Sequence, residues 1–218
     1  MRNGGSGRYL IDRESIVLRA IEIVRDEGLA ALTVRNLADG LGVTAPALYR
    51  HVRDKDELVS LVSDAIFAEI DLPNAGDGDW ADQLELIARR ARSVLLGYPG
   101  LGLRALESTQ TFPVPNAQRI ADAAYRLMRA GGFDEQTSVI ALRALRHFCS
   151  VGLPPDLGAR SQPTKHAKPV AFGTQSDGSD ADLDSSFDFG LRCLIFALRE
   201  QAMHGPDRVL GRRSRAAD

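Results

Sequence analysis

The sequence is short of cysteine, has no long apolar segment and carries almost no excess charge. Each of these shortages excludes a class of protein. Cys149 and Cys193 are the only cysteines among 218 residues, too few for the disulfide framework of a small secreted domain. No apolar run approaches the ~20 residues that a membrane-spanning helix needs. Residues 1–11 lack the apolar stretch of a signal peptide. We therefore expect a cytoplasmic protein with no membrane contact, reduced core cysteines and a flexible N-terminal arm over residues 1–11.

Motifs that mark enzymes are also missing. The sequence has no phosphate-cradling glycine loop, no Gly-x-Ser-x-Gly turn and no His/Cys spacing typical of a metal site. The run Asp180–Asp184 resembles a calcium loop only in part, because Ser185 and Leu191 stand where such a loop has glycine and glutamate. We interpret this run as a solvated loop that precedes a helix. The prediction is a protein that is not an enzyme and holds no cofactor or metal.

Charge is balanced overall but uneven along the chain. The formal net charge of −2 argues against a protein that coats nucleic acid without specificity. Between residues 35 and 55, however, four basic residues face two acidic ones, with His51 beside them. The basic residues of this window are Arg35, Arg50, Arg53 and Lys55.

Helical patterns dominate the N-terminal part. Asp12 is placed to cap a first helix that Gly28 ends. Thr33 caps a second helix that Gly42 ends, and Thr44 caps a brief third. A fourth helix opens at a capping box of Asp54 and Glu57. This helix has two apolar faces, which predicts that it bridges two packing units. One face carries Leu58, Leu61, Val62, Ala65 and Ile66, and the other carries Phe67 and Ile70.

The rest of the chain is also predicted to be helical. Its last helix is apolar nearly all round, as expected for an element that packs against both a core and a partner. The expected helices run over Trp80–Leu95, roughly 101–109, from about Ile120 to 130, Glu135–Val151 and Phe187–Met203. They are separated by a linker at 71–79 and a Gly-, Pro- and Ser-rich loop at 152–186. A polar tail follows at 204–218, which is either solvated or in contact with DNA or another chain.

The fold class that follows is all-α, with two parts. An N-terminal three-helix helix-turn-helix head is expected over residues 12–58. A larger helical ligand-binding and dimerisation domain is expected over residues 59–203.

The second and third helices carry the most informative pattern. Two short helices joined by a glycine-containing turn form a helix-turn-helix, whose second helix enters the major groove of DNA. Small residues near the start of the third helix allow a close approach to the bases, and basic or hydroxyl-bearing neighbours suit phosphates. Capping or core packing is the alternative for His51, and simple solvation is the alternative for Arg50. The predicted DNA-contacting residues are Arg35, Thr44, Ala45, Pro46, Ala47, Tyr49, Arg50, His51 and Lys55.

The run from Leu41 to Leu58, LGVTAPALYRHVRDKDEL, resembles the recognition-helix signature of the TetR family of transcriptional regulators. The matching features are the Leu-Gly-Val turn, the Leu-Tyr-x-His ending and the lysine that opens the next helix. Glu27-Gly28 and Leu32–Arg35 also fit. The likeness extends to the tetracycline-repressor branch through Trp80–Leu96, Gly132-Phe133, His147-Phe148 and residues 187–201.

The resemblance implies a homodimer formed through the last two long helices, and a small-molecule effector bound in the helical domain. We expect the dimer interface to include Leu142, Leu145, Leu191, Leu194, Ile195 and Leu198. Candidate effector contacts are Phe112, Tyr125, Met128, His147 and Phe148. Core packing is the first reading for each of these five, and for His147 it means a hydrogen-bonded core histidine.

The sequence departs from the tetracycline repressor itself. That branch holds a Mg²⁺–tetracycline chelate with a histidine on the sixth helix, a nearby Thr-Arg-Pro turn and a drug-binding histidine at the end of the fourth helix. The stretch Leu101–Pro115 has no histidine and no such turn, and Ala68–Asp71 supplies no histidine either. The resemblance therefore does not favour tetracycline, or Mg²⁺, at the effector site.

The resulting hypothesis is a ligand-responsive repressor that binds a palindromic double-stranded DNA operator as a homodimer. A transcriptional activator of the same fold is one alternative. A helical ligand-binding protein without DNA binding, and a helical enzyme that uses the bundle cavity, are two others.

Overall fold

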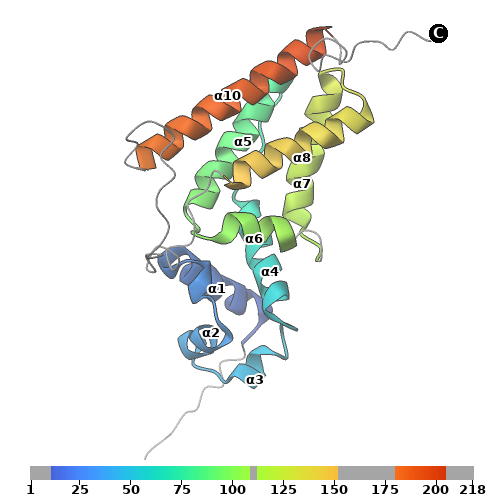
Figure 1. Cartoon of the computed structure of the whole chain (residues 1–218). Coiled ribbons are helices and arrows are strands. Elements are labelled where there is room, and N and C mark those ends of the chain that lie inside the picture. Colours follow the sequence, from blue (N-terminus) through green and yellow to red (C-terminus); the bar gives the residue numbers. More distant parts are fainter. Residues whose placement is uncertain (1–10, 109–111, 152–179, 205–218) are drawn as a thin grey trace, which may run out of the picture.

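The computed structural model describes residues 11–108, 112–151 and 180–204, and all regular structure in these ranges is helical, as expected (Figure 1). The expected N-terminal arm and polar tail lie almost wholly outside these residues, as does most of the expected long loop. In chain order the helices are α1 (Arg13–Glu27), a 3₁₀ turn (Leu29–Ala31), α2 (Val34–Leu41), α3 (Ala45–Leu48), α4 (Lys55–Ala68), α5 (Trp80–Leu96), α6 (Leu101–Ser108), α7 (Pro115–Ala130), α8 (Glu135–Val151) and α10 (Asp180–His204). Among the described helices, none combines the length and apolar character that crossing a membrane requires.

The predicted ends of the first helices are confirmed. The Asp12 side chain accepts a hydrogen bond from the backbone N–H of Ser15 at 2.8 Å, and Thr33 accepts one from Asn36 at 3.1 Å. Gly28 ends α1 with φ 85°, and Gly42 ends α2 in the left-handed region with φ 65° and ψ 31°. Glycine reaches these backbone conformations without the steric penalty that a Cβ would add. These two positions therefore set where the chain turns.

The head, made of α1, α2 and α3, closes around one apolar core. Leu37, Leu48 and Val52 are all at least 94% buried, while Leu41 and Val43 are partly buried against them. One side of α1 completes this core with Ile16, Ala20, Ile23 and Val24.

Helix α4 joins the head to the rest of the molecule (Figure 1). Its residues Leu58, Val62 and Ile66 are buried in the head's core cluster. The same cluster continues through Leu95, Tyr98, Leu101 and Ala105 at the end of α5 and in α6. The helix packs against α1 on one side and against α5, α6 and α7 on the others. The prediction that the fourth helix bridges two packing units is confirmed.

Polar contacts join the C-terminal end of α4 to the N-terminal end of α7. Arg119 of α7 donates hydrogen bonds to the carbonyls of Phe67 and Ile70, at 3.1 and 2.9 Å, where α4 ends. A cation at this position is favoured because the last carbonyls of a helix carry partial negative charge. Asp64 of α4 accepts a hydrogen bond from the backbone N–H of Asn116 at 2.7 Å, in the first turn of α7. The two helices therefore cap each other.

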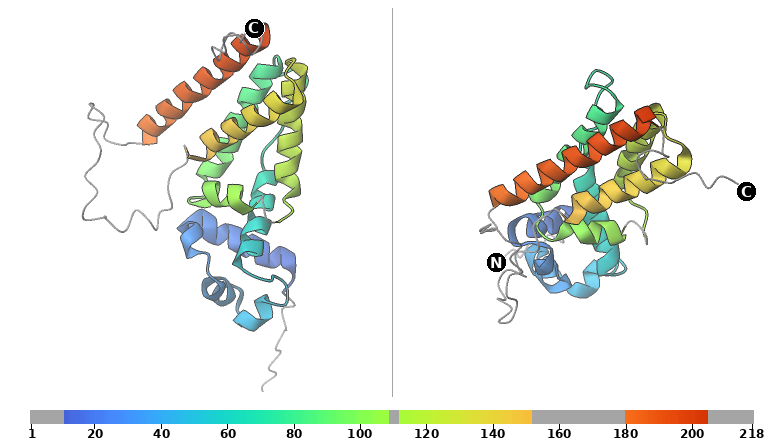
Figure 2. Two further views of the ribbon diagram at one scale, coloured as in Figure 1. Left: turned by 45° about the vertical axis from the view of Figure 1, so that its right-hand side comes forward. Right: turned by 45° about the horizontal axis from the view of Figure 1, so that its top comes forward.

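A second apolar core is formed by α5, α7, α8 and α10. In both views of Figure 2, and in Figure 1, α10 lies beside α5 and α8 at the end of the molecule away from α3. Met128 and Leu191 are fully buried there, and Leu84 nearly so. Of the two cysteines expected in the core, Cys149 is partly buried but Cys193 is exposed on α10, so the expectation was wrong for Cys193.

Helix α10 begins at Asp180, seven residues before the predicted start at Phe187, so the expected loop does not extend to residue 186. The reason is tertiary: Asp184, which precedes the predicted start, pairs with Arg92 of α5, and Asp188 one turn later pairs with Arg89. Acidic residues are also favoured near a helix N-terminus. The run that resembled a calcium loop is therefore the first turn of this helix.

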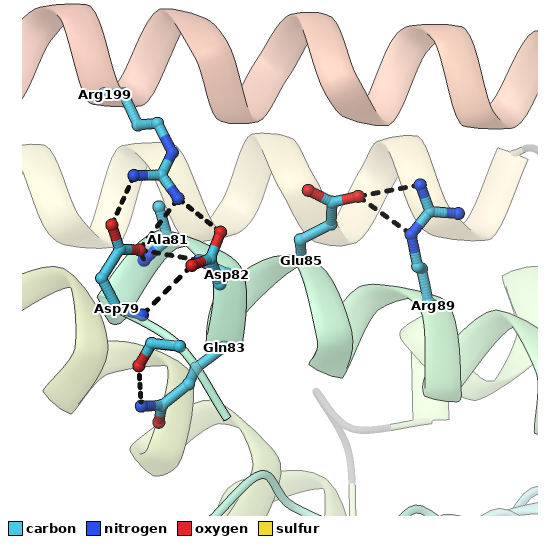
Figure 3. Close-up of polar contacts among 8 residues, drawn as sticks. Asp79, Ala81, Asp82, Gln83, Glu85, Arg89 and Arg199 are labelled. Atoms are coloured by element: carbon cyan, nitrogen blue, oxygen red, sulfur yellow. Dashed lines mark hydrogen bonds and ion pairs between the residues drawn. The ribbon is translucent and has the colours of Figure 1, made fainter. Parts of the chain in front are cut away.

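The far end of α10 is held to the start of α5 (Figure 3). Arg199 donates to the carboxylates of Asp79 and Asp82, with one Nη2 bond of 2.9 Å to Asp79 and another of 2.6 Å to Asp82. Asp79 also caps α5. Bonds to Arg199, together with those from backbone N–H groups, keep the pKa of Asp79 below its usual value. Charge pairs thus fix the antiparallel register of α5 and α10.

The C-terminal end of α7 is packed too tightly to accept a side chain at Gly131. A Cβ there would lie 2.7 Å from Cδ2 of Trp80, whose ring meets that of Phe133 edge-on at 5.5 Å. The backbone of Gly131, with φ −73° and ψ 0°, is one that alanine adopts freely.

We expect Gly131→Ala to destabilise the fold by about 1–3 kcal/mol, because only the displacement of a packed ring makes room for the methyl group. Urea unfolding followed by circular dichroism measures the change. Gly76→Ala is the matched control, since no atom lies within 4 Å of a Cβ there. Equal stability of the two variants would contradict the packing described for Trp80.

Candidate nucleic-acid interface

The segment Thr44–His51 projects from the head. Leu48 is only 1% exposed and anchors the segment, while Tyr49 is 51% exposed and Arg50 is also exposed. Thr44 and Pro46 are exposed, and Ala45, Ala47 and His51 are half-buried. All the residues predicted to contact bases therefore lie at the surface, around one buried leucine.

The start of α3 differs from the prediction in one detail. Thr44 occupies the N-cap position, but its side chain makes no capping hydrogen bond. Its exposed hydroxyl is consequently available to an external partner. Pro46 and the two alanines add little bulk beside it, so a duplex could approach this turn closely.

Basic residues flank the projecting segment. Arg35 of α2 has a side chain 93% exposed, and its guanidinium lies 3.8 Å from the carboxylate of Asp39, a long ion pair that water screens. Lys55 is exposed at the first position of α4, where free backbone N–H groups also favour an anion. Arg35, Arg50 and Lys55 are thus exposed basic residues that stand before, within and after the segment that carries Thr44 and Tyr49.

The predicted capping box at the start of α4 is only half correct. Asp54 accepts the expected hydrogen bond from the backbone N–H of Glu57 at 2.8 Å. Glu57 does not return a bond to Asp54; it accepts one from the backbone N–H of Arg53 at 2.7 Å and pairs with Arg13 of α1. The bond from Arg53 is the main reason that the pKa of Glu57 lies below its usual value. Glu57 therefore ties α4 both to the turn before it and to α1.

The five candidate effector residues do not converge on one site. Met128 is fully buried and Phe148 partly buried in the second core, where Phe148 stacks on Phe187 with ring centroids 5.3 Å apart. Tyr125 is half-buried on α7. Phe112 lies against the head instead, with the guanidinium of Arg53 5.1 Å from the centre of its ring.

His147 is neither a core histidine nor enclosed by the protomer. It is exposed on α8, and its Nδ1 lies 2.8 Å from the carbonyl oxygen of Arg143 one turn earlier. The apolar side of α8 that faces the core carries Leu145, with Leu142 and Phe148 beside it. His147, two residues after Leu145, falls on the opposite side of the helix. The expectation of burial for His147 was wrong for this reason.

Sequence reasoning missed a buried arginine. Arg92 of α5 is 5% exposed, pairs with Asp184 at 2.7 Å and lies over the Phe187 ring at 4.3 Å. Its spacing from Ala88 and Leu95, four and three residues, places it on the buried side of α5 and was the available signal. A buried arginine held by a carboxylate and an aromatic face links α5 to the beginning of α10.

A buried tyrosine links the head to the bundle. Tyr98 is 3% exposed, receives a hydrogen bond from Arg25 of α1 and donates one to Glu69 after α4, both at 2.6 Å. Burial, reinforced by Glu69, raises the pKa of Tyr98, so the hydroxyl stays protonated and able to donate. The backbone bond from Leu29 to the carbonyl of Pro99, at 2.9 Å, supports the same junction.

The residues predicted for the dimer interface divide into two groups. Leu145, Leu191 and Ile195 are at least 92% buried inside the protomer, where they are unavailable to a partner. Leu142, Leu194 and Leu198 are partly buried against the same core. Among the side chains of α8 and α10 whose burial is described, the large apolar ones that are exposed are Val139, Ile140, Phe189, Phe196 and Met203.

Comparison with known proteins agrees with this arrangement. Residues 16–62 match the family described as "Bacterial regulatory proteins, tetR family", and residues 72–171 match "Tetracyclin repressor-like, C-terminal domain". A curated HTH-type transcriptional regulator of Saccharopolyspora erythraea is 30% identical over 88% of this chain and 86% of its own. The class A tetracycline repressor from transposon 1721, in Escherichia coli, is 30% identical over 87% of this chain and 91% of its own.

Among solved structures, apo ActR from Streptomyces coelicolor superposes with a TM-score of 0.71 at 26% identity, covering 90% of this chain and 98% of that one. One family match covers the head and the other the helical bundle, and each of the two curated relatives covers both parts. The chain therefore belongs to the TetR family of bacterial regulatory proteins and is a DNA-binding transcriptional regulator.

Proposed function

We propose that two copies of this protein act together as an effector-controlled repressor, with the Thr44–His51 segment of each copy in the major groove of an operator. The observation that carries the proposal is the exposure of Thr44, Tyr49 and Arg50 around a buried Leu48, with Arg35 and Lys55 on either side. Arg50 has the geometry to read a guanine, and Tyr49 the hydroxyl to bind a phosphate. An activator of the same fold would use the same surface, so a transcription assay is the measurement that distinguishes repression from activation.

The second copy is proposed to cover the outer face of α8 and α10. Phe189, Phe196 and Met203 are spaced by seven residues, so they fall on one side of α10, and each is 65–67% exposed. Val139 and Ile140 add apolar area on α8. Large exposed apolar side chains in a row mark a protein–protein interface. This face replaces the more deeply buried leucines as the proposed contact.

The effector is proposed to act within the bundle of α5, α7, α8 and α10, beside the aromatic pair Phe148 and Phe187. A change there would reach the head through α4, which belongs to the head's core and caps α7. We propose a cytoplasmic protein without catalytic activity, in keeping with a regulator that must meet DNA.

Arg50→Ala should weaken operator binding by roughly 5- to 150-fold, the range of about 1–3 kcal/mol for a well-made base contact. Tyr49→Ala should also weaken it, by the loss of a hydrogen bond to a charged phosphate. Fluorescence anisotropy on a duplex enriched by the wild-type protein from a random pool measures this change. Arg126→Ala, an exposed arginine on α7, is the matched control and should bind like the wild type. Full affinity in both head variants would exclude the proposed DNA face.

Phe196→Glu should convert the dimer into a monomer, because it places a charge within an apolar contact. Analytical ultracentrifugation gives the mass in solution, and operator affinity should fall with it, since each head alone contacts only half of the site. The control is Leu18→Glu, which places the same charge at an exposed apolar residue of α1. Phe67→Glu would not serve as a control, because Phe67 packs on the head's core and its substitution would disturb the fold. A dimeric Phe196→Glu protein would place the interface elsewhere.

Tetracycline with Mg²⁺ should not release the protein from its operator. The stretch Leu101–Pro115 offers no histidine, and no group of three or more metal-binding side chains occurs among the described residues. The anisotropy assay, repeated with the chelate at increasing concentration, measures release. Dissociation at micromolar chelate would show that another set of ligands replaces the missing histidine.

A further inference from the structure

Arg53 lies in the turn between the Thr44–His51 segment and α4, and Phe112, from the helical domain that follows the head, lies against it. Its guanidinium lies 5.1 Å from the centre of the Phe112 ring, which belongs to the segment between α6 and α7. Arg53 is thus a head residue in contact with a residue of the helical domain that follows the head.

Glu57 fixes the same arginine from a second direction. Its carboxylate accepts hydrogen bonds from the backbone N–H and from Nε of Arg53, at 2.7 and 3.3 Å. The Glu57 side chain is itself only 14% exposed and is also paired with Arg13. The Nε edge of the guanidinium is therefore occupied by Glu57, and the Phe112 ring lies beside the group.

The outer edge of the guanidinium is open. The Arg53 side chain is 71% exposed, and its terminal nitrogens have no hydrogen-bond partner among the described residues. An arginine that lies over a ring and keeps both Nη groups free retains the planar fork that binds a phosphate with two hydrogen bonds. Phe112 and Glu57 already restrict the side chain, so little further ordering is needed when an anion binds.

The position of Arg53 favours DNA as the source of that phosphate. It stands three residues after Arg50 and two before Lys55, in the turn that connects the proposed base-reading segment to the start of α4. A second contact supports the α4 side of this turn, where Arg104 of α6 pairs with Asp56 at 2.7 Å. Two residues of the helical domain, Arg104 of α6 and Phe112, thus contact this turn or the first residues of α4.

We propose that Arg53 binds a phosphate of the operator and that Phe112 positions it for that contact, so that the effector domain acts on a DNA contact directly as well as through α4. The proposal rests on the DNA-binding surface proposed above. A shift of Phe112 removes the ring from beside the guanidinium and loosens the hold on the phosphate, without any change in the Thr44–His51 segment itself.

The test is the salt dependence of binding to the duplex enriched by the wild-type protein. Arg53→Gln should make the negative slope of log K against log salt shallower by about 0.9, the change expected when one phosphate fewer is neutralised by the protein. Arg126→Gln, which removes the same charge from an exposed site on α7, should leave the slope unchanged. If Arg53→Gln and Arg126→Gln share the wild-type slope, Arg53 binds no phosphate.

The role of Phe112 is tested by a pair of substitutions and a double mutant. Phe112→Leu keeps an apolar side chain but removes the ring, and should weaken binding about two- to fivefold, the size of an exposed cation–π contact. Phe112→Tyr keeps the ring and should bind like the wild type. In the Arg53→Gln background, Phe112→Leu should have no further effect, because the residue that it positions is gone.

Three results would overturn the positioning role: undiminished affinity in Phe112→Leu, equally weakened binding in Phe112→Tyr, or a weakening by Phe112→Leu that persists in the Arg53→Gln background. Thermal melting of each variant separates these results from unfolding. Absence of any duplex enriched by the wild-type protein would instead count against the proposed function itself. The two failures are therefore distinguishable.

Discussion

Burial of Leu48 and Val52 in the core of the head is the constraint on which the DNA-facing surface depends. A helix of four residues has no stability of its own in water, so α3 exists because its leucine is enclosed by α1, α2 and the start of α4. That single anchor forces the neighbouring side chains outward. Small residues on one side of the anchor and Tyr49 and Arg50 on the other then determine what the surface can bind.

The same core makes the head and the bundle respond together. Helix α4 contributes Leu58, Val62 and Ile66 to a cluster that also contains Tyr98 and Leu101. One continuous apolar core therefore joins the head to the beginning of the helical domain that follows it. Packed cores move as units and do not deform continuously. Polar contacts then give the junction a definite geometry: Arg119 and Asp64 join α4 to α7, and Tyr98 joins α1 to the end of α4.

Local patterns in the sequence predicted the fold well, and contacts between distant segments account for what they missed. The caps at Asp12 and Thr33 and the ends at Gly28 and Gly42 are decided within a few residues, and all are confirmed. The predicted start of α10 was wrong because Asp184, which precedes it, pairs with Arg92, a residue 92 positions earlier in the chain. No spacing rule within the last segment could show that.

The candidate sites divide in the same way. The surface residues of α3 followed from one local signature, whereas the effector and interface residues depend on how α5, α7, α8 and α10 cross. Phe112 was expected near an effector and lies under Arg53, and Leu191 was expected at a partner and fills the protomer's own core. An apolar residue on a helix with two apolar faces has two possible neighbours, and only the packing of the other helices selects one.

The central claim, that two projecting α3 segments enter one face of a duplex, is tested most directly by methylation protection of guanine N7 on a bound operator. The account predicts two protected patches in the major groove, related by a two-fold axis and about one helical turn apart, roughly 34–36 Å. A single patch, or binding that leaves every major-groove guanine open to methylation, would contradict it.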